Sequence, residues 1–141
     1  DALVLASSKN AATEKTDLDQ QSPSELLKQP LALLNNRFEM RRQIDAYFTA
    51  HSLNPRVTLE ANSLGFLIEM VKYGGLRTIL PESIVASMED LISIPVEPAL
   101  PAHTATMIIR KAAYRSRATD AFLRLALLWD LPSVLGHRRG P

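Results

Sequence analysis

The chain has 141 residues, 46% of them apolar and 22% charged, which is the length and composition of about one globular domain. Its 16 lysines and arginines nearly balance its 15 acidic residues, which argues against a surface that binds nucleic acid through the phosphates. The absence of cysteine excludes disulfides, cysteine-ligated zinc and thiol catalysis. No run approaches the roughly 18 apolar residues of a membrane helix, and the start lacks the basic residues of a signal peptide. We therefore expect a cytoplasmic protein without membrane contact.

The first third of the chain alternates between strand and helix patterns. Residues 3–6 form a short apolar run typical of a strand, and the polar residues 7–21 are expected to form a loop. A short helix is predicted from Ser22, with Ser22 as its cap and Glu25 at the third helical position, ending near Pro30. The apolar residues 31–34 predict a second strand.

Two amphipathic helices follow. The first covers about 39–50, because Ile44, Tyr47 and Phe48 repeat at helical spacing. Residues 56–61 alternate between polar and apolar and predict a strand. The second helix starts after Asn62-Ser63 and ends at the pair Gly74-Gly75. Its apolar face is expected to comprise Leu64, Leu67, Ile68 and Val71.

The last part of the chain predicts three more strands and one helix. The strands cover 78–80, 91–96 and 106–110, and Pro95 places the middle one at a sheet edge. Ser116 is expected to cap the final helix. The inward face of this helix is expected to include Ala118, Ala121, Phe122, Leu125 and Trp129. Strands that alternate with helices indicate an α/β protein with a mostly parallel sheet.

The sequence contains no arrangement typical of an enzyme. None of the three histidines (His51, His103 and His137) has the spacing of a metal site, and there is no Gly-x-Ser-x-Gly turn or Gly-x-Gly-x-x-Gly loop. We expect no metal, no cofactor and no catalytic residue. Arg41, Arg42 and Lys72 are interpreted as solvated side chains on helix faces.

Two turns between a strand and a helix are the candidate ligand sites. One contains Asn36, Arg37 and Phe38, and the other contains Asn62 and Ser63. In open parallel sheets, ligands bind beyond the carboxyl ends of the strands, where helix N-termini offer unpaired N–H groups. The alternative is that asparagine and serine act here only as helix caps.

Three blocks of the sequence resemble the effector domains of LysR-type transcriptional regulators. They are 31–48, 57–81 (with Glu60-Ala61-Asn62-Ser63 and Gly74-Gly75) and 109–123, and they occur in the family's order. Within the family, the stretches 41–45 and 60–63 look closest to the cyanate-operon regulators.

The resemblance implies a periplasmic-binding-protein-like (type 2) fold, with one complete lobe and the returning part of the other. Residues 1–9 would be the crossing strand of lobe one and its hinge, 10–104 lobe two, 105–132 the returning strand and helix of lobe one, and 133–141 a flexible tail. Ligand contacts carried over from the family fall on Asn36, Arg37, Phe38, Asn62 and Ser63. The hinge falls on Ser7, Ser8, His103 and Thr104. The chain departs from the family at Leu76, which stands where a second glycine often follows.

The function implied by the resemblance is to sense a small inducer in a cleft between the lobes. Such regulators are homodimers or tetramers, and they bind DNA only through an N-terminal helix-turn-helix, which this sequence lacks. Two alternatives stay open: a solute-binding protein of the same fold, and an α/β enzyme. The upstream sequence would distinguish them.

Overall fold

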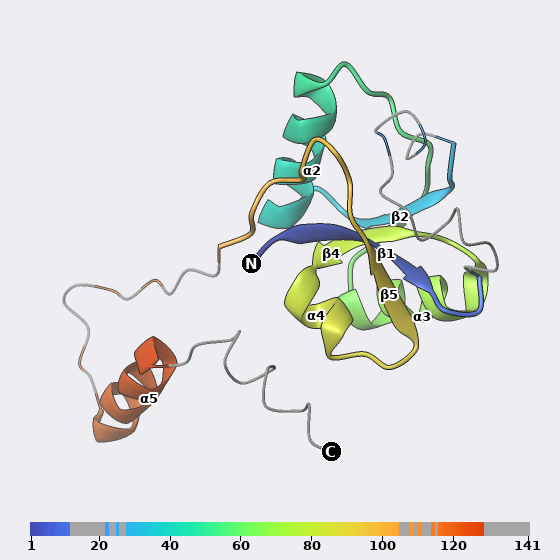
Figure 1. The fold of residues 1–141 in the computed structure, drawn as a ribbon. Helices are drawn as coiled ribbons and strands as arrows, with labels where there is room; N and C mark the ends of the chain where they lie inside the picture. Colours follow the sequence, from blue (N-terminus) through green and yellow to red (C-terminus); the bar gives the residue numbers. More distant parts are fainter. Residues whose placement is uncertain are drawn as a thin grey trace. The chain divides into compact units, whose positions relative to one another are not determined.

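The computed structural model describes residues 1–11, 22, 25, 28–104, 108, 110, 114 and 116–128. The chain divides into two compact units, Asp1–His103 and Thr104–Pro141, and each is described by itself. Unit 1 contains all the described strands and three of the described helices, and it is a mixed α/β structure (Figure 1). Among the described residues, no helix has the length and apolar character needed to cross a membrane.

A three-stranded antiparallel sheet lies in the middle of unit 1. Strand β1 (Leu3–Ser8) is the central strand, between β4 (Thr78–Pro81) and β5 (Leu91–Ile94). Leu5 of β1 is fully buried and is paired with Ile79 on one side and Ile94 on the other. The predicted edge position of the strand near residues 91–96 is confirmed, and the strand ends just before Pro95.

A second sheet consists of two parallel strands, β2 (Leu31–Leu34) and β3 (Val57–Ala61). An isolated parallel bridge between Leu31 and Arg77 places the start of β4 beside β2. The prediction of a mostly parallel sheet is therefore wrong for β1, which runs antiparallel to both of its neighbours. Strand–helix alternation predicts the direction of consecutive strands, but β1 pairs with strands about 70 and 90 residues later in the chain.

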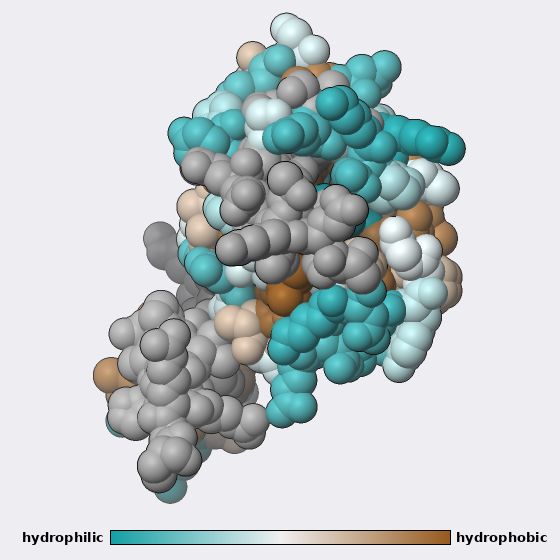
Figure 2. Space-filling model, turned by 45° about the vertical axis from the view of Figure 1, so that its right-hand side comes forward, coloured by the Kyte–Doolittle hydropathy of each residue, from teal (hydrophilic) through white to brown (hydrophobic). Residues whose placement is uncertain are grey.

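The two longer helices of unit 1 occupy the predicted positions. Helix α2 (Glu39–Ala50) buries Met40, Ile44, Tyr47 and Phe48. Helix α3 (Leu64–Gly74) buries Leu67, Ile68 and Val71 and leaves Leu64 half-buried. Figure 1 shows α2 on one side of the strands and α3 and α4 on the other. Figure 2 shows a mostly hydrophilic surface at the top of the view, the height at which Figure 1 places α2. Each helix thus turns its apolar stripe to the sheet.

The helix ends follow from capping chemistry. The Ser63 hydroxyl accepts a hydrogen bond from the backbone N–H of Phe66, and Gly75 ends α3 in the left-handed conformation with φ 65°. Upstream, Ser22 and Glu25 exchange the two hydrogen bonds of a capping box, as predicted. These bonds to Ser22 lower the pKa of the Glu25 carboxyl. The bounds of the helix predicted there lie outside the described residues.

Helix α4 (Glu82–Ala86) was not predicted from the sequence. It is a single short turn that follows Pro81 directly, and only Val85 in it is buried. One buried residue in five gives no helical period. Hydrophobic spacing therefore cannot predict short elements of this kind.

Unit 2 contains helix α5 (Arg117–Leu128), which begins as predicted. The Ser116 hydroxyl accepts a hydrogen bond from the Thr119 N–H at 3.1 Å and so caps the helix. The predicted inward face is exposed, with Phe122 at 61% and Leu125 at 68% of their full accessibility. The inward orientation expected for this face is therefore not found among the described residues. Trp129, most of the predicted strand 106–110 and the tail 133–141 lie outside them.

Candidate functional site

The structure brings the two predicted ligand turns to the same edge of the parallel sheet. Strands β2 and β3 run side by side, and their last residues, Leu34 and Ala61, are paired. The next backbone N–H, that of Asn35, donates to the Ala61 carbonyl at 2.8 Å. The five predicted ligand residues all lie in this double turn and all are exposed: Asn36, Arg37, Phe38, Asn62 and Ser63.

Local hydrogen bonds shape each of the two turns. The Asn35 side chain accepts from the Arg37 N–H at 3.1 Å, which is the geometry of an Asx turn. Ser63 caps α3 through a long bond of 3.5 Å to the Phe66 N–H, while Phe38, the N-cap of α2, makes no side-chain cap bond. The capping alternative therefore accounts for part of the role of Ser63 but not for Asn36, Arg37 or Asn62.

Arg41 lies directly beneath these turns. Its contacts with them were not predicted from the sequence. Its guanidinium donates to the Leu34 carbonyl at 2.7 Å, to Asp45 at 2.8 Å and to Glu60 at 2.9 Å. Its side chain is only 11% exposed, so its interpretation as a solvated residue is wrong. Burial lowers the pKa of Arg41, but the hydrogen bonds to the two carboxylates outweigh this and the net pKa is raised.

The neighbouring cations behave differently from Arg41. Arg42 is 60% exposed and pairs with Glu39 within α2, as its interpretation as a surface residue predicts. Lys72 is less exposed, at 21%, and pairs with Asp90 at 2.9 Å. The one sequence signal for Arg41 was the i, i+4 spacing to Asp45. No local pattern points to Glu60, which lies 19 residues away.

The two predicted hinge segments are not close together. Ser7 and Ser8 are buried in the last part of β1, opposite Ile92 and Leu91. His103 lies at the other end of the strand, where its N–H donates to the Asp1 carbonyl at 2.7 Å. β1 is thus the central strand of the three-stranded sheet of unit 1, and the assignment of residues 1–9 to the first lobe stays a prediction. The segments that the structure does place side by side are 1–2 and 102–103, where Ala2 and Ala102 also form a bridge.

Helix α2 holds the segment that returns toward residue 103. The Tyr47 hydroxyl donates to the Pro98 carbonyl at 2.6 Å, and Gln43 contacts the His103 ring at 3.5 Å. Burial raises the pKa of the Tyr47 hydroxyl, and the negative charge of Glu97 adds to this shift. The helix that begins at the first ligand turn therefore also contacts the return segment.

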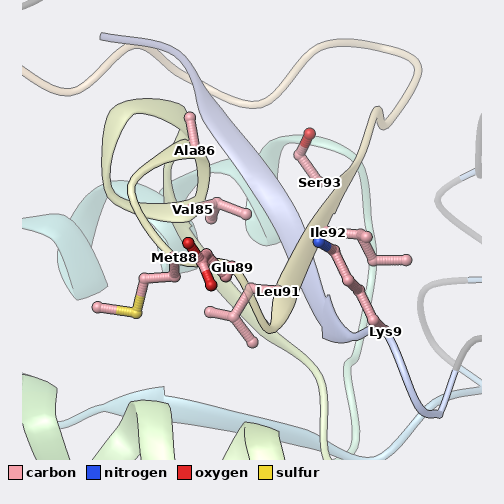
Figure 3. A pocket seen from close by; sticks show the side chains of 8 residues that line it. All are labelled: Lys9, Val85, Ala86, Met88, Glu89, Leu91, Ile92 and Ser93. Carbon is pink, nitrogen blue, oxygen red and sulfur yellow. The ribbon is translucent and has the colours of Figure 1, made fainter. Parts of the chain in front are cut away.

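A hollow of about 520 Å³ lies beside α4, β5 and the residue that follows β1 (Figure 3). Its lining is partly apolar, with Val85, Met88 and Leu91, and also includes Lys9 and Glu89. None of the predicted ligand residues lines it. Among the described residues there is also no group of three acidic or histidine side chains that could hold a metal ion.

Solved structures of several regulator domains have a similar fold. The regulatory domain of CcmR from Synechocystis PCC6803, in complex with 2-PG, matches with a TM-score of 0.68 and 14% identity over 90% of this chain and 62% of its own. The effector-binding domain of QuiR, in complex with shikimate, matches with a TM-score of 0.64 and 17% identity over 90% of this chain and 60% of its own. HinK, a LysR family transcriptional regulator from Pseudomonas aeruginosa, matches with a TM-score of 0.64 and 17% identity over 87% of this chain and 42% of its own.

These matches show a periplasmic-binding-protein-like fold, and at such low identity they establish the fold alone. The family model of the LysR substrate binding domain matches residues 1–128. The chain therefore belongs to the LysR substrate-binding domain family. It spans about three-fifths of the CcmR regulatory domain, at 62% of its length.

Proposed function

We propose that this chain is the inducer-sensing part of a LysR-type transcriptional regulator. The observation that carries the proposal is the double turn at the carboxyl ends of β2 and β3, where two helix N-termini and the five exposed residues of 36–38 and 62–63 meet. Such edges are where open α/β sheets bind ligands. Ligand binding would stabilise one arrangement of the two lobes and so shift the population of transcriptionally active protein.

A small, polar and negatively charged effector fits this edge. Arg37 is exposed and forms no ion pair with another described residue, so its guanidinium is available to an anion. The helix N-termini add partial positive charge. Relatives of the same fold have been solved with 2-PG and with shikimate, which carries a carboxylate. An anionic effector is the chemistry that these features share, and we extend the proposal to it.

The remaining expectations belong to the intact protein. DNA would be bound through an N-terminal helix-turn-helix, the protein would be a cytoplasmic homodimer or tetramer, and no bond-making chemistry would occur. The finer proposal is a relationship to the cyanate-operon regulators, based on the stretches 41–45 and 60–63. The same two stretches supply Arg41, Asp45 and Glu60, which are joined by ion pairs. Membership of a regulator family favours this role over a solute-binding protein of the same fold.

The proposal is tested by calorimetric titration of the intact effector domain with cyanate, phosphate, shikimate and 2-phosphoglycolate. Asn62→Ala and Ser63→Ala should each weaken binding about ten- to a hundredfold, because a hydrogen bond to a charged ligand contributes roughly 1.5–3 kcal/mol. Ser87→Ala is the matched control, since Ser87 is exposed at the end of α4, away from the turns. Unchanged affinity in both turn variants would remove these residues from the site.

A further inference from the structure

We propose that Arg41 is a positioning residue that holds the two candidate ligand turns in one fixed arrangement. This inference rests on the proposed function for its purpose, but the contacts on which it depends are independent of any ligand. Arg41 stands in the first turn of α2, three residues beyond the turn residue Phe38. Its side chain points back beneath the turn rather than into solvent, as its 11% exposure shows.

The guanidinium contacts the ends of both strands that carry the turns. One nitrogen donates to the carbonyl of Leu34, the last residue of β2, and thereby closes the turn 35–38 at its base. A second nitrogen donates to Glu60, the residue before the end of β3. The third donates to Asp45 one turn along α2, which fixes the orientation of the planar group. A single side chain thus joins β2, β3 and α2.

Helix stability alone does not account for this residue. A cation in the first turn of a helix faces the positive end of the helix dipole, which is unfavourable. Arg41 is also largely buried, and burial of a charge requires compensating partners. The three directed bonds supply that compensation, and they use the planar fork of arginine, which lysine cannot reproduce.

The role of Arg41 differs from that of a ligand counter-ion. Its charge is already matched by the carboxylates of Asp45 and Glu60. Besides Arg41, a second tie between the turns is the hydrogen bond from the Asn35 N–H to the Ala61 carbonyl. That backbone bond by itself would leave the turns free to rotate about it. The bonds of Arg41 to Leu34 and Glu60 restrain this rotation. A ligand would then meet a preorganised site and lose less entropy on binding.

The test is amide hydrogen exchange on the full-length regulator without ligand. Arg41→Lys and Glu60→Ala should each accelerate exchange in the segments 35–38 and 61–63 by about two- to fivefold, the range expected for a partly exposed ion pair. The double variant should show no more acceleration than Arg41→Lys alone, because Arg41→Lys already breaks the bond to Glu60. Arg42→Lys is the matched control: its ion pair with Glu39 lies within α2, and exchange in both segments should stay unchanged.

Several outcomes would overturn the inference. These are unchanged exchange in segment 61–63, a multiplicative effect in the double variant, an equal effect of Arg42→Lys, and acceleration spread evenly over β1 and α3. Should Arg41→Lys fail to fold, Glu60→Ala decides the question alone, because Glu60 is 54% exposed. The variants could change exchange as expected in a protein that binds none of the anions tested. That result would refute the proposed function and leave the role of Arg41 established.

Discussion

Gly75 shows most directly how one residue is fixed by backbone conformation. Its φ of 65° lies in the left-handed region, and a Cβ built there would meet no atom within 4 Å. We expect Gly75→Ala to lower the free energy of unfolding by about 1–2 kcal/mol, through backbone strain alone. Gly74→Ala is the control, because Gly74 is the last helical residue and its added Cβ would make only ordinary contact with Leu76. Urea denaturation should show an unchanged or slightly higher stability for it.

Tyr47 predicts a dependence of stability on pH. Tyr47→Phe removes the hydrogen bond to the Pro98 carbonyl and should cost about 1 kcal/mol near neutral pH. The pKa of Tyr47 is raised in the folded protein, so the fold favours the protonated hydroxyl. The contribution of Tyr47 is therefore fully present below the ordinary tyrosine pKa of about 10 and is lost as the pH rises through the folded pKa.

The measurement is the difference in unfolding free energy between wild type and Tyr47→Phe as a function of pH. This difference should be constant from about pH 7 to 9 and should shrink in more alkaline solution. Contributions that the two proteins share cancel in the difference. A difference in unfolding free energy between the two proteins that increases above about pH 10 would contradict this expectation.

Arg41 and Arg42 show where prediction from sequence ends at the residue scale. The two are identical and adjacent, yet Arg41 is 11% and Arg42 60% exposed. Both can form an ion pair with a carboxylate at helical spacing, which the sequence displays. What distinguishes them is Glu60, brought near Arg41 by the pairing of β2 with β3. A contact of that kind depends on the completed sheet, so no local pattern encodes it.

At the scale of elements, prediction succeeded where periodicity and caps agree. Helices α2 and α3 each have an apolar stripe over three turns and a clear stop, and both were placed correctly. Strands β2 and β3 were found because four or five apolar or alternating residues lie between turn residues. The direction of β1 and the partners of β4 were not predictable, because strand pairing over long sequence separations leaves no mark on the spacing of residues.

Helix α5 supports a prediction about what covers its apolar face. Phe122 and Leu125 are exposed among the described residues, and an apolar face of this kind is normally covered. We expect another chain or another part of the protein to bury it in the intact regulator. Phe122→Ala should then cost about 3 kcal/mol of unfolding free energy. Leu127→Ala, on the opposite face and 84% exposed, should change it by less than about 0.5 kcal/mol. Equal, small effects of both would show that the face stays exposed.

At the scale of the whole molecule, the position of the site follows from topology more than from the site residues themselves. The turns at 35–38 and 62–63 were predicted to share an edge because both follow parallel strands, and the structure places them together. The hinge at Ser7, Ser8, His103 and Thr104 stays a prediction, and the structure places Ser7 and Ser8 at the other end of β1 from His103. Small polar residues in a crossing segment resemble a hinge in sequence, but in β1 they are buried in a sheet. Burial of that kind depends on β5, whose Ile92 and Leu91 pair with Ser7 and Ser8 from much later in the chain.

The regulator hypothesis itself predicts that effector and DNA binding are coupled. An effector that changes the affinity for operator DNA by some factor must be bound more tightly, or more weakly, by the same factor when DNA is present. We expect this factor to be about 5 to 150, corresponding to roughly 1–3 kcal/mol of coupling. Titrations of the full-length protein with the effector, with and without operator DNA, measure it. Ser63→Ala should weaken effector binding in both titrations while leaving their ratio near the wild-type value, because the proposed role of Ser63 is to contact the ligand. A ratio of one in the wild-type protein would mean that ligand binding carries no signal to the DNA, and the chain would then act as a binding domain without a sensing role.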